Sequence, residues 1–397
     1  MSVPARRSLS LLTGLLLLAG CSHAPTLRQG APSAPPPPTV GASGEDRLYT
    51  TPVSFNDLPG WGDDALAQAI PALRRSCEKI THMPAGQLVG NDGQGGVAGD
   101  WLAPCGALRA VAADDHVAAR GFFESWFQPY RVSGGARPDG LFTGYYQAEL
   151  RGSRRPGGRY QTPLYTRPAG LAADPSLSGT PYFTRAEIEA GALRGKASEL
   201  LWVDDPVDAH ILHIQGSGRV TMDDGTVVQV GFNGSNGQKF VGLGSILARH
   251  GKLAAGETNM PSIRSWLKTH PTEAPGLMAE NPRYVFFRLI EGDGPLGAQG
   301  VALTAGRSMA VDPRFIPLGV PLWLDSTDPD GLPMRRLMVA QDTGAAIKGV
   351  IRGDIFWGGG EAAFDKAGRM KSRGSYYLLL PRGRSGPVAL NSSPARR

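Results

Sequence analysis

Glycine and proline interrupt this chain at short intervals, which leaves little room for long regular helices. The 397 residues include 54 Gly and 33 Pro, both well above the average usage of roughly 7% and 5%. Only 19% of the residues are charged, whereas coiled coils and helical bundles need charge-rich, Gly-poor sequences. The 41% hydrophobic content is enough to build a core and excludes a wholly disordered chain. The sequence therefore predicts a β-rich protein with many turns.

The first twenty residues have the pattern of a leader that is removed from the mature protein. Two arginines precede an apolar run at residues 11–18, which is shorter than the ~20 residues of a membrane-spanning helix. The run ends in the letters LAGC, with Cys21 last, and this resembles the lipobox of bacterial lipoproteins. We expect residues 1–20 to be a signal peptide and the thiol of Cys21 to be lipidated. Serine follows the cysteine, which favours the outer membrane; the alternative is an ordinary secretory signal with an incidental cysteine.

A proline-rich stretch and one isolated cysteine pair follow the leader. Residues 21–46 contain a run of four prolines and few core-forming residues, so we expect an extended tether. Cys77 and Cys105 are the only other cysteines. In an oxidising periplasm such a pair is most simply a disulfide, which would contribute on the order of 3–4 kcal/mol to stability. Two buried free thiols are the alternative.

The pattern of apolar residues predicts a few helices early in the chain and mainly strands after residue 140. Helical spacing occurs at residues 66–73, where Pro71 would limit the helix, and at 116–130, which would end near Pro129. No comparable helix is predicted until residues 242–250 and 261–269. Asp224-Gly225 is a strong hairpin signal between two of the strands. The predicted strands are residues 141–146, 201–203, 209–215, 219–222, 226–230, 284–289, 301–304, 320–324, 337–340 and 376–380.

Several classes of function lack support in the sequence. His210 and His213 are three residues apart on a predicted strand, where they would face opposite sides, so we expect no metal site. No nucleotide-binding motif indicates a cofactor, and we expect none. No basic run interleaved with aromatics occurs, so we do not expect nucleic-acid binding.

Carboxylates are the remaining candidates for chemistry. Asp342 and Asp354 bracket a segment with glycines at 344, 349, 353 and 358, which would let the backbone turn sharply and approach a ligand. Phe356 and Trp357 follow directly and offer faces on which sugar rings could stack. This combination favours glycan chemistry, in which a carboxylic acid protonates a glycosidic oxygen. The alternative is that these aspartates cap turns, which is the role we expect for Asp312.

Five motifs, in order, resemble one known family. They are FTGYY at 142–146, IQGSG at 214–218, NPRYVFF at 281–287, residues 303–317, and residues 341–358. Each motif alone is weak, but the set covers about residues 60–380. The sequence is identified as a member of the membrane-bound lytic murein transglycosylase A family of Gram-negative bacteria. It departs from the family pattern at Ala345, where a second glycine is common.

The resemblance implies a mainly β fold. A double-psi β-barrel would form from residues 47–150 and 286–381, with a few helices on the N-terminal side. A second, smaller β-barrel-like domain would be inserted at residues 151–285. The glycan strand would lie in a groove between the domains, and residues 382–397 would form a flexible tail.

The resemblance also implies the reaction and its residues. The family cleaves the β-1,4 bond between N-acetylmuramic acid and N-acetylglucosamine in peptidoglycan without water, forming 1,6-anhydromuramoyl ends. Its single catalytic aspartate aligns with Asp354, and Asp342 aligns with a supporting acid. The acid role requires a raised pKa for Asp354. The expected substrate-binding residues are Thr143, Tyr145, Tyr146, Gln215, Ser217, Lys348, Phe356 and Trp357.

Two rival functions remain at this stage. One is a hydrolytic muramidase that uses Asp354 and Asp342 as a pair; the other is a non-catalytic glycan-binding lipoprotein similar to expansins. The expected partners are peptidoglycan glycan strands and the outer membrane, through the lipid anchor, on its periplasmic side. Proteins of cell-wall synthesis or division are further candidate partners that the sequence does not identify.

Overall fold

The computed structural model describes residues 47–134, 139–172, 175, 180–292 and 294–384. The expected signal peptide, the tether with Cys21 and most of the expected C-terminal tail lie outside these residues. None of the helices in the described part of the chain is long and apolar enough to cross a membrane.

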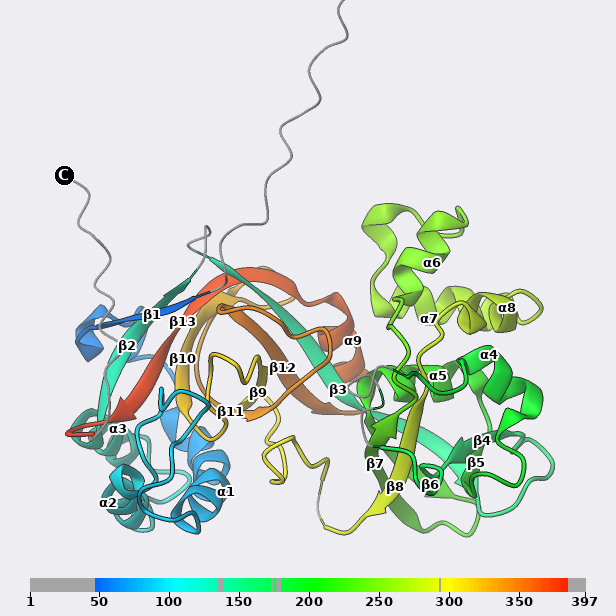
Figure 1. Cartoon of the computed structure of the whole chain (residues 1–397). Coiled ribbons are helices and arrows are strands. Elements are labelled where there is room, and N and C mark those ends of the chain that lie inside the picture. Colours follow the sequence, from blue (N-terminus) through cyan, green and yellow to red (C-terminus); the bar gives the residue numbers. More distant parts are fainter. Residues whose placement is uncertain (1–46, 135–138, 173–174, 176–179, 293, 385–397) are drawn as a thin grey trace, which may run out of the picture. The chain divides into compact units, whose positions relative to one another are not determined.

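A closed ring of strands forms the larger part of the structure (Figure 1). The strand order is β13-β10-β11-β9-β12-β3, and β3 pairs back to β13, which closes the barrel. Two N-terminal strands, β1 and β2, continue the sheet from one edge of β13. The ranges of these strands are β1 Leu48–Pro52, β2 Phe127–Gly134, β3 Gly140–Ser153, β9 Ser308–Val311, β10 Pro321–Thr327, β11 Pro333–Asp342, β12 Arg352–Gly359 and β13 Lys371–Pro381.

Three N-terminal helices pack with the barrel into one hydrophobic core. They are α1 (Ile70–Thr81), α2 (Gly99–Leu108) and α3 (His116–Trp126). Trp101 of α2 and Trp323 of β10 are fully buried in this core. A disulfide joins Cys77 of α1 to Cys105 of α2, with their Cα atoms 5.5 Å apart. The predicted disulfide is therefore confirmed, and the alternative of two free thiols is wrong.

The second sheet grows out of the same long strand that helps to close the barrel. Residues 141–147 of β3 pair with β12, whereas residues 148–152 pair with β6. The predicted hairpin at Asp224-Gly225 is confirmed, since β6 and β7 pair antiparallel on either side of it. The strands of this sheet are β4 Thr162–Tyr165, β5 Glu199–Val203, β6 Ser217–Met222, β7 Val227–Ser235 and β8 Val285–Ile290.

Helices from three parts of the chain cover the second sheet and share its core. Ala363, Phe364 and Ala367 of α9, which follows barrel strand β12, belong to this core rather than to that of the barrel. The helices after β4 are α4 Arg185–Glu187, α5 Pro206–Gln215, α6 Leu243–Arg249, α7 Met260–Thr269, α8 Ala274–Ala279 and α9 Glu361–Arg369. Shorter helical turns are Phe55–Asp57, Leu66–Ala69, Ile188–Ala192 and Ala255–Glu257.

The prediction of a strand at residues 209–215 is wrong, because this segment belongs to helix α5. The Asp205 side chain caps the helix by accepting from the amides of Val207 and Asp208. Gly216, at φ 81°, ends it in the left-handed conformation. His210 and His213 therefore share a helix face instead of pointing to opposite sides.

Other element predictions also need correction. Pro71 lies in the first turn of α1, where it starts the helix rather than limiting it. The helix at 116–130 ends at Trp126, and β2 begins at the next residue. Residues 301–304 contain only an isolated bridge, between Leu296 and Ala302. The elements that were not predicted are helices α2, α4, α8 and α9 and strands β1, β2, β4, β9 and β12.

Candidate active site

The two aspartates lie on the two strands that flank β9. Asp342 is the last residue of β11, and Asp354 lies in β12. Both pair in register with Ala310 of β9, which runs between them. Because adjacent strands are about 4.8 Å apart, the two backbones are roughly 10 Å apart at this level. Pairing with β9 thus brings together two acids that are separated by a loop in the sequence.

Asp354 belongs to a regular strand, so the alternative that it caps a turn is wrong. Gly353 is extended, and a Cβ there would lie 2.5 Å from Met309 Sδ and 2.8 Å from a Phe142 ring carbon. This glycine is therefore required by packing inside the barrel. Gly349 and Gly358, at φ 117° and 94°, do adopt the left-handed conformation that favours glycine.

Among the described residues, Asp354 has one direct hydrogen-bond partner, and that partner is itself bound by a cationic side chain. The hydroxyl of Thr143, the β3 residue in register with Asp354, donates to Asp354 Oδ1 at 2.5 Å. Arg352 donates in turn to Thr143 Oγ1 at 2.8 Å. Burial raises the pKa of Asp354 to about 6; the Thr143 hydrogen bond and the Arg352 charge oppose this rise, and the Asp342 charge adds to it.

Asp342 is held by three donors. Its Oδ1 accepts from the amides of Ala298, at 2.8 Å, and Thr343, at 2.9 Å. Its Oδ2 accepts from the Tyr145 hydroxyl at 2.9 Å. Burial raises the pKa of Asp342, and these three hydrogen bonds partly offset the rise. The structure therefore places Thr143 and Tyr145 against the two acids, one against each.

The two aromatic residues after Asp354 differ in exposure. Phe356 is only 3% exposed and packs against Tyr145, with ring centroids 5.3 Å apart. Its face is not open, so the expectation that sugars stack on Phe356 is wrong for this structure. Trp357 is partly exposed, and the Lys366 ammonium lies 5.3 Å from the centre of its ring.

In the described part of the chain, no hydrogen bond joins the remaining predicted residues to either acid. Tyr146 is buried against Phe364 of α9, on the face of β3 opposite to Tyr145. Gln215 accepts from the Tyr146 amide at 3.2 Å, and Ser217 starts β6. Lys348 is exposed in the segment between β11 and β12.

Asp312 caps a turn, as predicted. Its carboxylate accepts from the amides of Arg314, at 3.2 Å, and Gly349, at 2.9 Å. It therefore fixes one end of the segment between the two acids.

The contact between Arg352 and Thr143 was not predicted from the sequence. The place of Arg352 two residues before Asp354 was a usable signal, because alternate residues of a strand share one face. The turn interpretation of this segment hid that relation.

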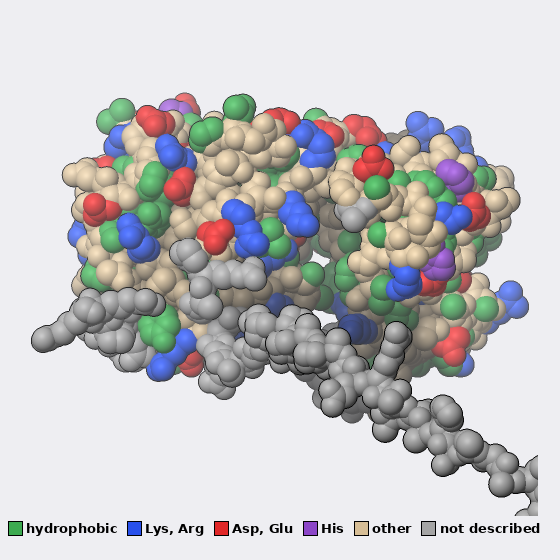
Figure 2. Space-filling view, turned by 90° about the horizontal axis from the view of Figure 1, so that it is seen from above, with side chains coloured by type: hydrophobic (Ala, Val, Ile, Leu, Met, Phe, Trp, Pro, Cys, Tyr) green, Lys and Arg blue, Asp and Glu red, His purple; other side chains and the backbone are tan. Residues whose placement is uncertain are grey.

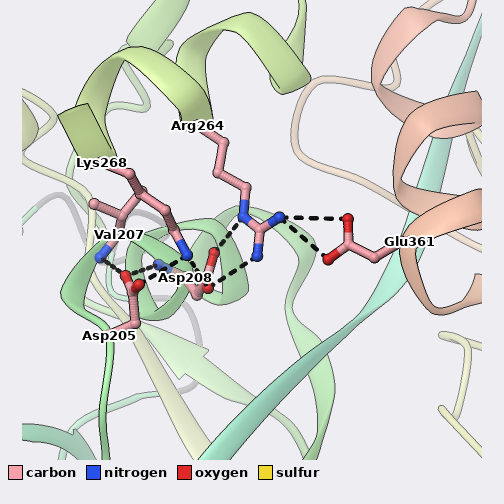
Figure 3. Close-up of polar contacts among 6 residues, drawn as sticks. All are labelled: Asp205, Val207, Asp208, Arg264, Lys268 and Glu361. Atoms are coloured by element: carbon pink, nitrogen blue, oxygen red, sulfur yellow. Dashed lines mark hydrogen bonds and ion pairs between the residues drawn. The ribbon is translucent and has the colours of Figure 1, made fainter.

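A second polar cluster links α5, α7 and α9 (Figure 3). Arg264 of α7 binds Asp208 of α5 at 2.7 Å and Glu361 of α9 at 3.2 Å. Lys268 binds Asp208 at 2.6 Å. The described residues include no group of three or more His, Cys, Asp or Glu that could hold a metal ion. This cluster is an ion-pair network rather than a metal centre.

The visible surface carries mixed charges. In Figure 2, Lys and Arg side chains alternate with Asp and Glu across the displayed face, without one large patch of either sign.

Two family models match this chain along the two sheets. The MltA specific insert domain matches residues 141–288, and the 3D domain matches residues 307–380. The membrane-bound lytic murein transglycosylase A of Escherichia coli strain K12 is 30% identical over 380 residues, covering 92% of this chain and 93% of that protein.

Solved structures agree with these matches. The lytic transglycosylase LtgG of Burkholderia pseudomallei is 42% identical, with a TM-score of 0.61 over 85% of this chain and 97% of its own. MltA from Neisseria gonorrhoeae is 31% identical, with a TM-score of 0.73 over 85% and 94%. Escherichia coli MltA with bound chitohexaose is 27% identical, with a TM-score of 0.63 over 84% and 91%. This chain belongs to the membrane-bound lytic murein transglycosylase A family.

Proposed function

We propose that this protein is a peptidoglycan lytic transglycosylase in which Asp354 is the only acid and base. It cleaves the β-1,4 bond between N-acetylmuramic acid and N-acetylglucosamine and leaves a 1,6-anhydromuramoyl end. The observation that carries the assignment to Asp354 is its geometry: among the described residues this carboxyl group accepts one hydrogen bond, whereas Asp342 accepts three. Its pKa, raised to about 6, fits an acid that works near neutral pH.

The reaction needs one carboxyl group in two states. Protonated Asp354 donates to the glycosidic oxygen as the bond to C1 breaks. The resulting carboxylate then accepts the proton of the muramoyl C6 hydroxyl while that oxygen attacks C1. Because the nucleophile belongs to the substrate, it is already close to C1, and no water has to be positioned.

The surroundings of Asp342 favour this mechanism over hydrolysis by an acid pair. All three hydrogen bonds to Asp342 stabilise its carboxylate. We propose that Asp342 holds Tyr145 in place and contributes negative charge that helps Asp354 to retain its proton. Within the residues that the structure describes, Asp342 is thus engaged as an acceptor, whereas a hydrolase needs a second carboxylate that is free to activate water.

The groove and the fold detail are part of the same proposal. We propose that the barrel is of the double-psi type, formed by residues 47–150 and 286–381, with residues 151–285 inserted. Chitohexaose bound to the Escherichia coli relative supports a glycan-binding groove between the two. Thr143, Tyr145 and Trp357 would line it near Asp354, with Gln215, Ser217 and Lys348 further along; Tyr146 would support its wall.

The location follows from the N-terminal pattern and the relatives' names. We propose that Cys21 carries a lipid that anchors the protein to the outer membrane, facing the periplasm. Replacing Cys21 with Ala should release active enzyme into the soluble fraction, and persistent membrane attachment would contradict the anchor. The substrate is the glycan strand; binding to cell-wall synthesis or division proteins remains a proposal without a residue assigned to it.

The decisive experiment is digestion of purified peptidoglycan by wild type, Asp354→Asn and Asp224→Asn, followed by mass spectrometry of the products. Wild type should release anhydromuropeptides, and Asp354→Asn should lose at least about 100-fold in rate. Asp224→Asn, at an exposed position in the hairpin of the second sheet, controls for the loss of an aspartate outside the site. Reducing muramoyl ends would instead indicate a muramidase, and equal slow solubilisation by wild type and Asp354→Asn would indicate a binding protein.

A further inference from the structure

Arg352 lies beside the acid without binding it. Arg352 and Asp354 share one face of β12, being two residues apart, yet no ion pair between them occurs among the described residues. The guanidinium instead donates to Thr143 Oγ1 at 2.8 Å and to the carbonyl of Leu141 at 3.2 Å. It also donates to the carbonyl of Gly353. The Arg352 guanidinium is thus bound to the backbone of β3 and of β12, and its remaining hydrogen bond in the described part of the chain is to the Thr143 hydroxyl.

The Thr143 hydroxyl can satisfy Arg352 only as an acceptor. A guanidinium has no acceptor atom, whereas a hydroxyl has one hydrogen and two lone pairs. The bond from Arg352 therefore occupies a lone pair of Oγ1, and the hydroxyl hydrogen is left for Asp354 Oδ1, 2.5 Å away.

This order of donors makes the two oxygens of Asp354 different. Oδ1 receives the Thr143 hydrogen and so acts as an acceptor. Within the described chain, no hydrogen bond reaches Oδ2, so that oxygen remains available for a proton and for the substrate.

We propose that Arg352 is a positioning residue that acts through Thr143, directing its hydroxyl hydrogen to Oδ1 so that Oδ2 of Asp354 gives up and receives the catalytic proton. This inference rests on the proposed function, since it assigns the oxygen by which Asp354 works. Without Arg352 the hydroxyl can rotate and accept a hydrogen bond from the protonated carboxyl group, which would hold the proton away from the substrate.

The test is a double-mutant cycle between Arg352→Met and Thr143→Val, with kcat for anhydromuropeptide release as the readout. Each single variant should lose about tenfold or more, the effect of one hydrogen bond to a charged group. Measured at a pH below the pKa of Asp354, where the carboxyl group is protonated in every variant, the double variant should lose no more than Thr143→Val alone, because the positioning effect of Arg352 requires that hydroxyl. Losses that multiply, or a normal kcat for Arg352→Met, would overturn the proposal.

A matched control separates positioning from net charge. Arg373 of β13 pairs in register with Leu141 from the side opposite to Arg352, and its guanidinium is exposed. Arg373→Met should therefore keep the wild-type kcat. An equal loss in this variant would assign the effect to general charge and overturn the proposal.

The pH profile gives a readout that a merely structural role would not move. The groups that affect Asp354 are Arg352 on its own strand, Thr143 and Tyr145 on β3 and Asp342 on β11. Removing the Arg352 charge should raise the pKa of Asp354. The fall of kcat at alkaline pH should therefore begin at a higher pH. Arg352→Lys keeps the charge, so its alkaline limb should stay at the wild-type pH, and a shifted limb would contradict the assignment. This variant also serves if Arg352→Met fails to fold. Loss of activity in Asp354→Asn with multiplicative losses in the cycle would refute only the role of Arg352, whereas an active Asp354→Asn would refute the proposed function itself.

Discussion

At the scale of single residues, the pKa of Asp354 determines the pH range of activity. Its burial raises this pKa to about 6, and the first step needs the protonated form. We expect kcat/KM to fall as the pH rises through about 6, because the fraction of protonated Asp354 falls. Initial rates of anhydromuropeptide release between pH 4.5 and 8 would measure this limb. A rate that stays constant across this range would contradict Asp354 as the acid.

The same raised pKa predicts that the acid weakens the fold at neutral pH. The pKa of Asp354 is higher in the folded state, about 6, than its ordinary value of 3.8. The protonated group therefore contributes its full stability to the fold below pH 3.8, and this contribution is lost as the pH rises through about 6. Asp354→Asn should therefore raise the free energy of unfolding at pH 8 by about 1–3 kcal/mol. Urea denaturation at pH 8 and pH 4.5 would check this, because the gain should shrink at the lower pH. An equal gain at both values would show that ionisation is not its cause.

At the scale of elements, local signals predicted some segments correctly, and non-local packing decided others. The hairpin at Asp224-Gly225 was predictable because its turn is encoded in adjacent residues. Helix α5 had its own signals, a cap at Asp205 and Gly216 after its last residue, but the apolar run between them resembled a strand. The glycines of β12 did not allow the strand to be predicted. Gly353 is required there by close packing against Met309 and Phe142, which lie far away in the sequence.

The same contrast applies to the candidate site. Asp342 and Asp354 were found from their motif, but their relation through Ala310 depends on the pairing of both β11 and β12 with β9, which is distant in the sequence. The role of Arg352 depends on the parallel register of β12 with β3, which no local pattern encodes.

The ion-pair network between α5, α7 and α9 gives a prediction at this scale. Arg264 and Asp208 are 24% and 17% exposed, whereas Glu361 is 78% exposed. Arg264→Met should lower the free energy of unfolding by about 1–3 kcal/mol, because it leaves Asp208 partly buried with only Lys268. Glu361→Gln is the matched control and should change it by less than about 0.5 kcal/mol. Urea denaturation of both variants would check this; equal losses would mean that the Glu361 contact, and not the Asp208 pair, carries the stability.

At the scale of the whole molecule, the two sheets share parts of the chain. Strand β3 pairs with β12 at one end and with β6 at the other. Helix α9 follows a barrel strand but buries Phe364 in the core of the second sheet, and Trp357 packs against both cores. Neither sheet can lose its structure without exposing apolar surface of the other.

We therefore expect the two sheets to unfold together. Leu212 lies in the core of the second sheet and Leu324 in that of the barrel, and both are fully buried. Replacing either with Ala should cost about 2–5 kcal/mol, and both variants should lower the temperature of one common transition in differential scanning calorimetry. Leu332→Ala, at a position that is 62% exposed, controls for the loss of a leucine and should leave the transition in place. Two transitions, each moved by only one of the core variants, would instead mean that β3 and α9 join two independent folding units.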